Sequence, residues 1–564
     1  MDVFPKRRYW QVAEGIILIW YNEVHGRSRG HLVTMTVKYF VLGICASLPF
    51  LGQPAFAEDS LAGFGNISSE REVQRPIAPR KKLKPLKKQT TVYPTPAATT
   101  FGAVPTTQLS IANVAPGLLP FFNNAPVFGL PGTVTGSFWD RTQLTGDWGG
   151  ARTDLAQHGF FFDLYSTSAF QDVTSGGLKT GTAFVQNTQL SVNIDTGRAG
   201  LWSGGLIHFT AQSRYGSNPS QTFTVGSYVP QYTALVEPGA LLWHDILPSE
   251  YFLVQALSKQ FSVVLGKISD VFIPDQTLFG NSYKYYFANF NFNKNPMTTN
   301  FYNPTAWAAL GVWTPAKWLA IGGGVLDPNS QADNFAKDAF DRVNLYLTAV
   351  ASYNIAGLPG QFSPAFNWSN KPKIDFAAPF GSLTSLAQVT QAVGVLVGSG
   401  MTANLPINFN GESWFAIANV SQYLFVKDDA ETVAQKLKSG QPINGVGIFA
   451  RAGYAPQDTN TVTVDASVAL FAHGLFDARP YDSFGVGFYW NQFSADLKND
   501  ITTLTLGTTN LKNESGVEVF YDFAITPAIR FIPSYQHIWN PLAAEVISNQ
   551  NKADIFLARL TVAF

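Results

Sequence analysis

The chain has 564 residues, of which 46% are apolar, 14% aromatic and only 13% charged, and its 38 basic and 38 acidic side chains cancel. This composition is too apolar for a disordered chain, and the length fits either several soluble domains or one large barrel. Beyond the N-terminal region, no apolar run approaches the roughly 20 residues that a membrane-spanning helix needs. A chain of this kind can occupy a membrane only as a closed β-barrel, because an open sheet edge cannot stay unpaired in hydrocarbon.

Residues 35–57 have the three parts of a secretory signal. Lys38 supplies the positively charged start, residues 39–51 form the apolar core, and residues 55–57 (Ala-Phe-Ala) form a small-x-small cleavage site. The pattern predicts that the chain is exported and that this segment is removed.

Residues 1–57 are accordingly assigned to a signal-peptide region. Residues 1–34 are then either an N-terminal extension or the product of a start codon placed too far upstream, in which case translation starts at Met35. The one cysteine of the chain, Cys45, lies in the removed segment. A mature protein beginning at Glu58 would therefore have no disulfide framework.

Residues 58–135 form a Pro/Lys-rich extension that includes the run "RKKLKPLKK". Basic residues interrupted by prolines predict an extended, disordered tether. Contact with an anionic surface or with the cell wall is the alternative interpretation. A nucleic-acid partner is not expected for an exported protein.

From Gly136 onward, short runs alternate between apolar and polar positions, most clearly in residues 186–195, 206–215 and 516–525. One apolar face and one face of amides and charges are typical of strands that separate lipid from a water-filled lumen. Tyr215 and Trp490 lie near the ends of apolar faces, where a barrel places its aromatic girdles. A secreted sandwich or propeller would also alternate, but the mixed polar faces and the lack of a fixed repeat favour the barrel.

We therefore predict an all-β fold, a transmembrane antiparallel β-barrel over residues 136–564, with a short N-terminal helix and the disordered extension before it. At roughly 25–30 residues per strand and loop, this segment holds about 14–18 strands around an aqueous channel, and its interior is not expected to be a packed core. Residues 556–564 alternate in the same way, so the final strand is expected to close the barrel and to turn its apolar face to lipid.

The stretch "QLTGDWGGARTDLAQHGFFFDL" resembles the opening motif of the carbohydrate-selective porins of the OprB family. The matching residues are Leu144, Thr145, Gly146, Asp147, Trp148, Gly149, Gly150 and Arg152. A second similar segment, "HGLFDARPYDSFGVGFYW", matches through Gly474, Leu475, Arg479, Pro480, Asp482 and Gly485. Further similar stretches follow in the family's order from Leu144 to the end of the chain.

This resemblance implies a single-chain barrel, commonly of about 16 strands, that lets sugars diffuse passively across a bacterial outer membrane into the periplasm. The implied partners are mono- or oligosaccharides, outer-membrane lipid and the barrel assembly machinery. The alternatives are a general porin, or one for other ions or small solutes, and a barrel that mainly binds or has a structural role. An anion porin would need a lumen of one sign, whereas arginines and acids are interleaved here.

Arg214, Glu518, Asp522 and Arg530 occupy the polar faces of predicted strands and are the first candidates for lumen residues that contact a sugar. Sugars are neutral polyols, so a lumen that selects them needs donors such as arginine and acceptors such as carboxylates. The alternative for each residue is that it only lines the channel or pairs with a neighbouring charge.

Structural roles are expected for a second group of residues. Asp147 and Arg152 are expected to cap and anchor the N-terminal helix, and Trp148 to pack. Arg479 and Asp482 are candidates for a salt bridge that pins a turn. Phe564 is expected to act in barrel assembly.

We do not expect an enzyme, a cofactor or a metal site. The sequence has no Gly-x-Ser-x-Gly nucleophile motif, and the five histidines after the signal region show no metal-ligand spacing. The glycine-rich run "LAIGGGVLD" has no following lysine to bind phosphate and is predicted to be a strand.

Overall fold

The computed structural model describes residues 133–216, 224–230, 232, 246–269, 278–279, 284–301, 305–330, 339–398, 405–439 and 442–564. The predicted signal-peptide region, residues 1–57, and nearly all of the predicted extension, residues 58–135, lie outside these described residues. None of the helices in the described ranges is long and apolar enough to cross a membrane.

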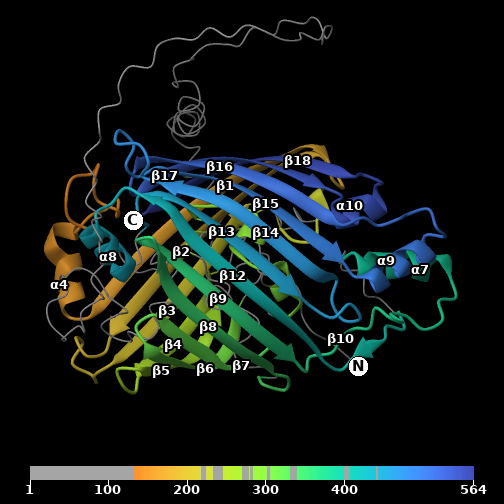
Figure 1. Cartoon of the computed structure of the whole chain (residues 1–564), viewed down its shortest axis with the longest axis horizontal. Helices are drawn as coiled ribbons and strands as arrows, with labels where there is room; N and C mark the ends of the chain where they lie inside the picture. Colours follow the sequence, from red (N-terminus) through yellow and green to blue (C-terminus); the bar gives the residue numbers. More distant parts are fainter. Residues whose placement is uncertain are drawn as a thin grey trace, which may run out of the picture. The chain divides into compact units, whose positions relative to one another are not determined.

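Sixteen strands of the described chain close into one antiparallel barrel, as the sequence predicted (Figure 1). Strands that follow one another in the chain are neighbours in the wall, and the ring closes where β1 pairs with β18, with Tyr165 opposite Ala563. The strands are β1 (Phe160–Gly176), β2 (Gly181–Asp195), β3 (Gly205–Gly216), β4 (Ile246–Ala256), β5 (Phe261–Ser269), β6 (Thr305–Ala316), β7 (Leu319–Leu326), β8 (Asn344–Ile355), β9 (Leu358–Ser369), β12 (Ser413–Val426), β13 (Gly445–Tyr454), β14 (Val462–His473), β15 (Ser483–Phe493), β16 (Glu514–Thr526), β17 (Ile529–Trp539) and β18 (Lys552–Ala563).

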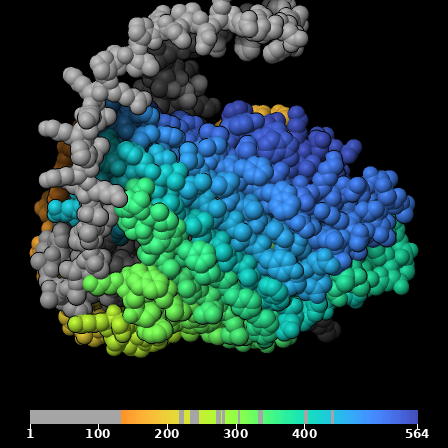
Figure 2. Space-filling view, viewed as in Figure 1, coloured from red at the N-terminus to blue at the C-terminus, as the bar shows by residue number. Residues whose placement is uncertain are grey.

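Side-chain alternation sorts the wall into an outer and an inner face. On β16, Val519 and Phe523 point outward and are 47% and 41% exposed, whereas Glu518 and Asp522 point inward and are fully buried. The outward apolar face predicted for the final strand is also present, because Phe556 and Leu560 on β18 are exposed. Figure 2 shows the outer face over the strands coloured cyan to blue, where side chains cover the wall continuously.

The two ends of the barrel differ in the length of their connections (Figure 1). At the short-turn end, β8 and β9 are joined by only Ala356 and Gly357, which have the positive φ angles of 53° and 87° that such a tight hairpin turn requires. The long-loop end holds most of the longer connections with their own secondary structure. These elements are α7 (Leu386–Leu396), α9 (Ala495–Leu504), α10 (Leu542–Ile547) and a small sheet of β10 (Lys373–Ile374) and β11 (Phe409–Asn410). The exception is α8 (Ala430–Ser439), which lies in the β12–β13 connection at the short-turn end.

The predicted N-terminal helix is α4 (Ala151–Gln157), and it joins both sides of the barrel seam at the short-turn end. Asp147 Oδ1 accepts hydrogen bonds from the backbone N–H of Thr153 (2.8 Å) and from its hydroxyl (2.7 Å), which caps the first turn. Arg152 donates to the backbone carbonyls of Phe162 (2.6 Å) and Phe564 (3.0 Å). Since Phe162 lies on β1 and Phe564 directly follows β18, one guanidinium contacts both strands of the closing pair.

The connection between β5 and β6 turns into the barrel, and we call its residues 284–301 the inner loop. It contains two short helical turns, α6 (Phe290–Asn293) and η6 (Pro296–Asn300). Phe287, Phe292 and the neighbouring rings of the loop are buried together with inward side chains of the wall. The expectation that the interior lacks a packed core is therefore wrong on this side of the barrel, because the inner loop fills the space next to the wall.

Candidate functional site

Glycines on the inner face of the wall make room for the rings of the inner loop. A Cβ atom at Gly485 would lie 2.7 Å from the ring of Phe287, and one at Gly487 would lie 2.5 Å from the ring of Phe292. Both glycines are inward positions of β15, and Phe287 also makes an edge-to-face contact with Phe520, with 4.7 Å between the ring centroids. A larger residue at either glycine would push the loop away from the wall, so these small positions set the depth to which the rings pack.

Asparagines give the inner loop its local shape. Asn289 is the N-cap of α6, and its Oδ1 accepts a hydrogen bond from the backbone N–H of Asn291 at 3.0 Å. Asn295 caps η6 in the same way, with Oδ1 accepting from the N–H of Met297 at 2.9 Å. Because helical turns this short cannot satisfy their own first N–H groups, the side-chain caps hold each turn in place.

Glu518 is the central contact between the wall and the inner loop. Its Oε1 accepts a hydrogen bond from the backbone N–H of Ala288, and its Oε2 accepts one from the N–H of Asn289, each at 2.8 Å. Both carboxylate oxygens thus bind consecutive amides of the turn that leads into α6. The carboxylate is fully buried, so the loop covers it completely.

The other strands from β13 to β18 each add an inward polar side chain to this attachment. Arg451 donates to the carbonyls of Phe292 and Asn293, Asp465 accepts from the amide of Asn295 (2.8 Å), Asn491 donates to Asn291 (3.0 Å), Gln536 accepts from Asn289 (3.0 Å), and Arg559 donates to the carbonyl of Tyr286. These contacts are made to backbone carbonyls and side-chain amides spread along the loop. They therefore fix the path of the whole loop along the wall.

The two ends of the inner loop contact other parts of the barrel. Near its start, Lys284 Nζ donates to Gln189 Oε1 of β2 at 2.5 Å and lies 4.3 Å from the ring centre of Tyr165 on β1. Near its end, the carbonyl of Asn300 accepts from Lys373 Nζ on β10, at the long-loop end. The loop is therefore tied to the wall on both sides of the seam and to the small sheet at the mouth.

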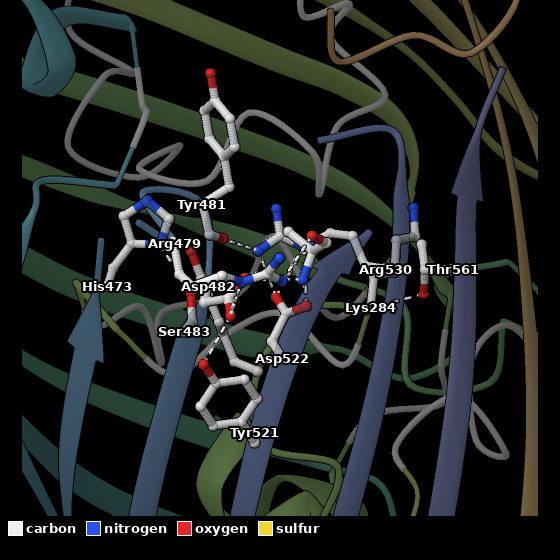
Figure 3. Close-up of polar contacts among 12 residues, drawn as sticks. Lys284, His473, Arg479, Tyr481, Asp482, Ser483, Tyr521, Asp522, Arg530 and Thr561 are labelled. Atoms are coloured by element: carbon white, nitrogen blue, oxygen red, sulfur yellow. Dashed lines mark hydrogen bonds and ion pairs between the residues drawn. The ribbon is translucent and has the colours of Figure 1, made fainter. Parts of the chain in front are cut away.

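Two pairs of opposite charges lie together towards the short-turn end (Figure 3). Arg530 Nε donates to both oxygens of Asp522, at 3.0 and 2.8 Å, and its NH2 group also donates to the carbonyl of Tyr481. Arg479 binds Asp482 in a bidentate pair, with distances of 2.9 and 2.8 Å. Each guanidinium thus has a carboxylate partner, and the pairs bring no excess of either sign to this region.

Asp482 also connects the turn between β14 and β15 to β16. Its Oδ2 accepts from the hydroxyl of Tyr521 at 2.7 Å, and its Oδ1 accepts from the backbone N–H of Ala524 at 3.0 Å. Arg479 donates to the carbonyl of Ala524 and stacks on Phe523, with 3.9 Å from guanidinium carbon to ring centre. Arg479 and Asp482 thus form the salt bridge at a turn for which the sequence made them candidates.

The part of the wall formed by β2, β3 and β4 carries a second polar network. Arg214 points inward from β3 and is buried, on the same face as His208. His208 lies within hydrogen-bond distance of Asn193 on β2 (2.7 Å) and of Glu250 on β4 (3.3 Å). Histidine, amide and carboxylate groups from three adjacent strands thus form one buried polar network on this part of the wall.

The structure does not bring the lumen candidates from the sequence together in one place. Asp522 and Arg530 lie together, Arg479 and Asp482 lie beside them, Glu518 lies under the inner loop, and Arg214 lies on the β2–β4 wall. Trp148 is half exposed next to α4, with its ring centre 5.1 Å from the guanidinium of Arg152. Sequence reasoning missed the inner loop and its anchors other than Glu518, and the alternating glycines of "FGVG" on β15 are the clearest signal of the loop.

Comparison with known proteins points to one family. The model of the carbohydrate-selective porin, OprB family, matches residues 179–564. The high-pH structure of Pseudomonas putida OprB matches with a TM-score of 0.60 at 16% identity, covering 76% of this chain and 100% of that chain. Its low-pH structure gives a TM-score of 0.44 at 14% identity, with coverage of 76% and 99%, and Pseudomonas aeruginosa OccK11 gives 0.38 at 8%, with 72% and 98%. The comparison with curated protein sequences finds no match.

Proposed function

Because the chain belongs to the OprB family of carbohydrate-selective porins, we propose that it lets sugars diffuse passively through its barrel into the periplasm. The family match over residues 179–564 and the closed barrel identify it as an outer-membrane porin of a bacterium. The fold and the family are those of channels rather than enzymes. Sugar selectivity and passive transport are the parts that we propose for this chain.

The pairing of charges is the observation that best supports a neutral polar solute. Arg530 is paired with Asp522, and Arg479 with Asp482. An aromatic ring lies next to the Arg530–Asp522 pair: the guanidinium carbon of Arg530 is 5.4 Å from the ring centre of Tyr285. A sugar needs hydrogen-bond partners and a flat face to stack on, whereas an ion needs a net field of the opposite sign.

We propose that the inner loop narrows the channel and sets its selectivity. Anchors on six successive strands, β13 to β18, support a fixed rather than a fluctuating constriction, because each holds the loop by backbone or amide groups. A solute then meets side chains at set positions. Binding at such a site must remain weak enough for the solute to leave.

Within this proposal the four lumen candidates differ in their roles. Arg530 remains partly exposed and would donate to the sugar, whereas the fully buried Asp522 would orient it. Arg214 would contribute from the opposite side of the seam. Glu518 acts through the inner loop, since its two oxygens are occupied by the N–H groups of Ala288 and Asn289. The sugar would contact the inner loop, and Glu518 would hold the loop in position.

The test is the block of ion current by sugars in planar bilayers. Arg530→Ala and Arg214→Ala should each lower sugar affinity by about five- to tenfold, in line with about 1–1.5 kcal/mol for a lost hydrogen bond, while ion conductance stays the same or rises. Val519→Ala, which changes a lipid-facing side chain of β16, is the control. Wild-type block in both arginine variants would contradict the assignment, and unchanged block with altered anion preference would favour a general porin.

A further inference from the structure

Towards the long-loop end, the outer face of the barrel seam carries a group of polar side chains that bond to one another. They come from the adjacent strands β17, β18 and β1, and we call them the seam cluster: Tyr535, His537, Asp554 and Ser175. Alternation along β17 and β18 turns their members outward, because the adjacent Ile538, Ala553 and Ile555 are fully buried inside the wall. Ser175 follows a bulge in β1 and lies opposite Asp554.

Asp554 organises the seam cluster. Its Oδ1 accepts hydrogen bonds from the hydroxyl of Tyr535 (2.7 Å) and from Nδ1 of His537 (2.5 Å), and its Oδ2 accepts one from the hydroxyl of Ser175 (2.5 Å). Because an ionised carboxylate can only accept, Nδ1 carries a proton and Nε2 of His537 points away from Asp554. Within the described ranges Nε2 has no hydrogen-bond partner, and the side chain is 19% exposed. The carboxylate is thus occupied, and the imidazole presents one free nitrogen on the outer face.

The seam cluster lies just below a ring of aromatic side chains at the long-loop end. Trp414 on β12, Tyr454 on β13 and Trp490 on β15 belong to this ring and point outward. On β17 the ring continues with Trp539, which is 40% exposed, contacts His537 edge to face at 4.5 Å and lies opposite the exposed Lys552 of β18. Aromatic girdles mark the level at which lipid headgroups meet hydrocarbon, so Lys552 is at headgroup depth.

A second outward carboxylate lies one step deeper in the wall. Asp172 on β1 is opposite Phe556 of β18, and Asp554 is the next outward residue of β18 towards the long-loop end. In the part of the chain that the structure describes, no group donates a hydrogen bond to the Asp172 carboxylate. A charge without a partner against hydrocarbon is costly, so Asp172 calls for a ligand that brings its own donors to this depth.

The order of these groups with depth matches one kind of lipid. The long-loop end of an outer-membrane barrel faces the cell exterior, where the leaflet consists of phosphorylated glycolipids. Such a lipid has phosphates on an amino-sugar headgroup and, directly beneath the sugar, acyl chains held by amide bonds. A cation at headgroup depth suits the phosphate, an aromatic face suits the sugar ring, and a deeper carboxylate suits the amide N–H groups. A glycerophospholipid has ester-linked chains and offers no N–H donors at that depth.

We propose that the seam cluster and its three neighbours bind the headgroup of one phosphorylated glycolipid of the outer leaflet. Lys552 donates to a phosphate, Trp539 stacks on the sugar, and Asp172 accepts from an amide N–H of the acyl chains. His537 accepts from a sugar hydroxyl through Nε2, and Asp554 holds the imidazole in the orientation that this contact needs. The site lies on the outer face of the wall and is independent of which solute the channel carries.

Lipid titrations followed by native mass spectrometry of the purified full chain test the chemistry of this site. The probes are lipid A, lipid A without its phosphates, and phosphatidylglycerol. We expect one lipid A molecule to be retained more tightly than either of the other lipids. Lys552→Met should weaken the binding of lipid A by about tenfold or more and leave the binding of the dephosphorylated form unchanged, because the lost contact is the one to phosphate.

Lys259→Met is the matched control, because it removes an exposed lysine from the β4–β5 turn at the short-turn end. It should bind lipid A like the wild type, and both variants should keep heat-modifiable barrels, since neither side chain is inside the wall. Equal binding of lipid A and phosphatidylglycerol by the wild type, or wild-type affinity for lipid A in Lys552→Met, would overturn the proposal.

A photo-crosslinking aromatic amino acid tests the location of the site in intact outer membranes. It replaces Trp539 in one variant and, as the control, Phe531, which points outward from the same strand near the short-turn end. We expect adducts with phosphorylated glycolipid from position 539 and adducts with glycerophospholipid from position 531. Adducts from position 539 with a second copy of the chain or with another protein, or the same lipid adducts from both positions, would contradict a glycolipid site at the seam.

Discussion

Replacing Glu518 tests whether the inner loop is held by the wall. In Glu518→Ala the backbone N–H groups of Ala288 and Asn289 lose their acceptors, which lie 2.8 Å away in the wild type. Both groups are buried, and an unsatisfied buried N–H costs about 1–3 kcal/mol, so the loss is about 2–6 kcal/mol for the attached state of the loop. Glu518→Gln keeps one carbonyl acceptor and should lie between the wild type and the alanine variant.

Two measurements report this loss. Hydrogen exchange of the inner loop should become at least about 30-fold faster in Glu518→Ala, which corresponds to the lower figure of about 2 kcal/mol. Single-channel recordings should show higher conductance and more current noise, because a loosened loop narrows the channel less and moves more. The barrel itself should keep its heat modifiability, since the strand pairing of β16 with β15 and β17 does not involve the carboxylate.

Val519→Ala is the matched control, because it truncates the next side chain of the same strand on the lipid face. It should leave both exchange and conductance unchanged. If Glu518→Ala also leaves loop exchange at the wild-type rate, the carboxylate does not hold the loop, and the positioning role is refuted. Faster exchange spread over the whole barrel would instead show that Glu518 supports the wall.

Three further predictions concern the ends of the barrel. Asp482→Ala should lower the free energy of unfolding by about 3–5 kcal/mol, because Arg479, Tyr521 and the N–H of Ala524 lose a buried partner; an unchanged urea midpoint would argue against this. Arg152→Ala should reduce the amount of protease-resistant barrel in the membrane, since contacts to both seam strands are lost, and deletion of Phe564 should do the same; normal amounts would refute a role in assembly. Burial and the neighbouring Lys371 charge lower the pKa of Lys373 to about 7 from its ordinary value of 10.5. The unfolded chain therefore binds more protons between these values, and the urea midpoint should rise with pH across this window in the wild type but not in Lys373→Met.

The strands could be predicted from the sequence because their pattern has a period of two. On β16 the alternation of residues 516–525 is enough to assign Val519 and Phe523 to the lipid face and Glu518 and Asp522 to the inside. Pairing with a neighbouring charge was among the alternatives for Arg530 and Asp522, and the structure pairs them with each other from neighbouring strands of one hairpin.

The inner loop could not be predicted in the same way. Its stretch "FANFNFN" alternates aromatic residues and asparagines, which imitates a strand, but Asn289 caps the short helix α6 and the other two asparagines lie within it. Its anchors lie far along the chain, as with Glu518 and Asn289, which are 229 positions apart. Local propensity carries no information on such distant partners, so the burial of Glu518 became visible only when the barrel brought the strands next to the loop.

The most direct test of the proposed function is solute flux through the purified protein in liposomes. Swelling rates are compared for neutral sugars, for polyethylene glycols of matched size, and for amino acids and small anions. A sugar-selective channel predicts that sugars enter several-fold faster than the other solutes of the same size, and that this preference falls in Arg530→Ala. Rates that depend on solute size alone, or a preference for one sign of charge, would contradict sugar selectivity and assign the chain to a general porin function.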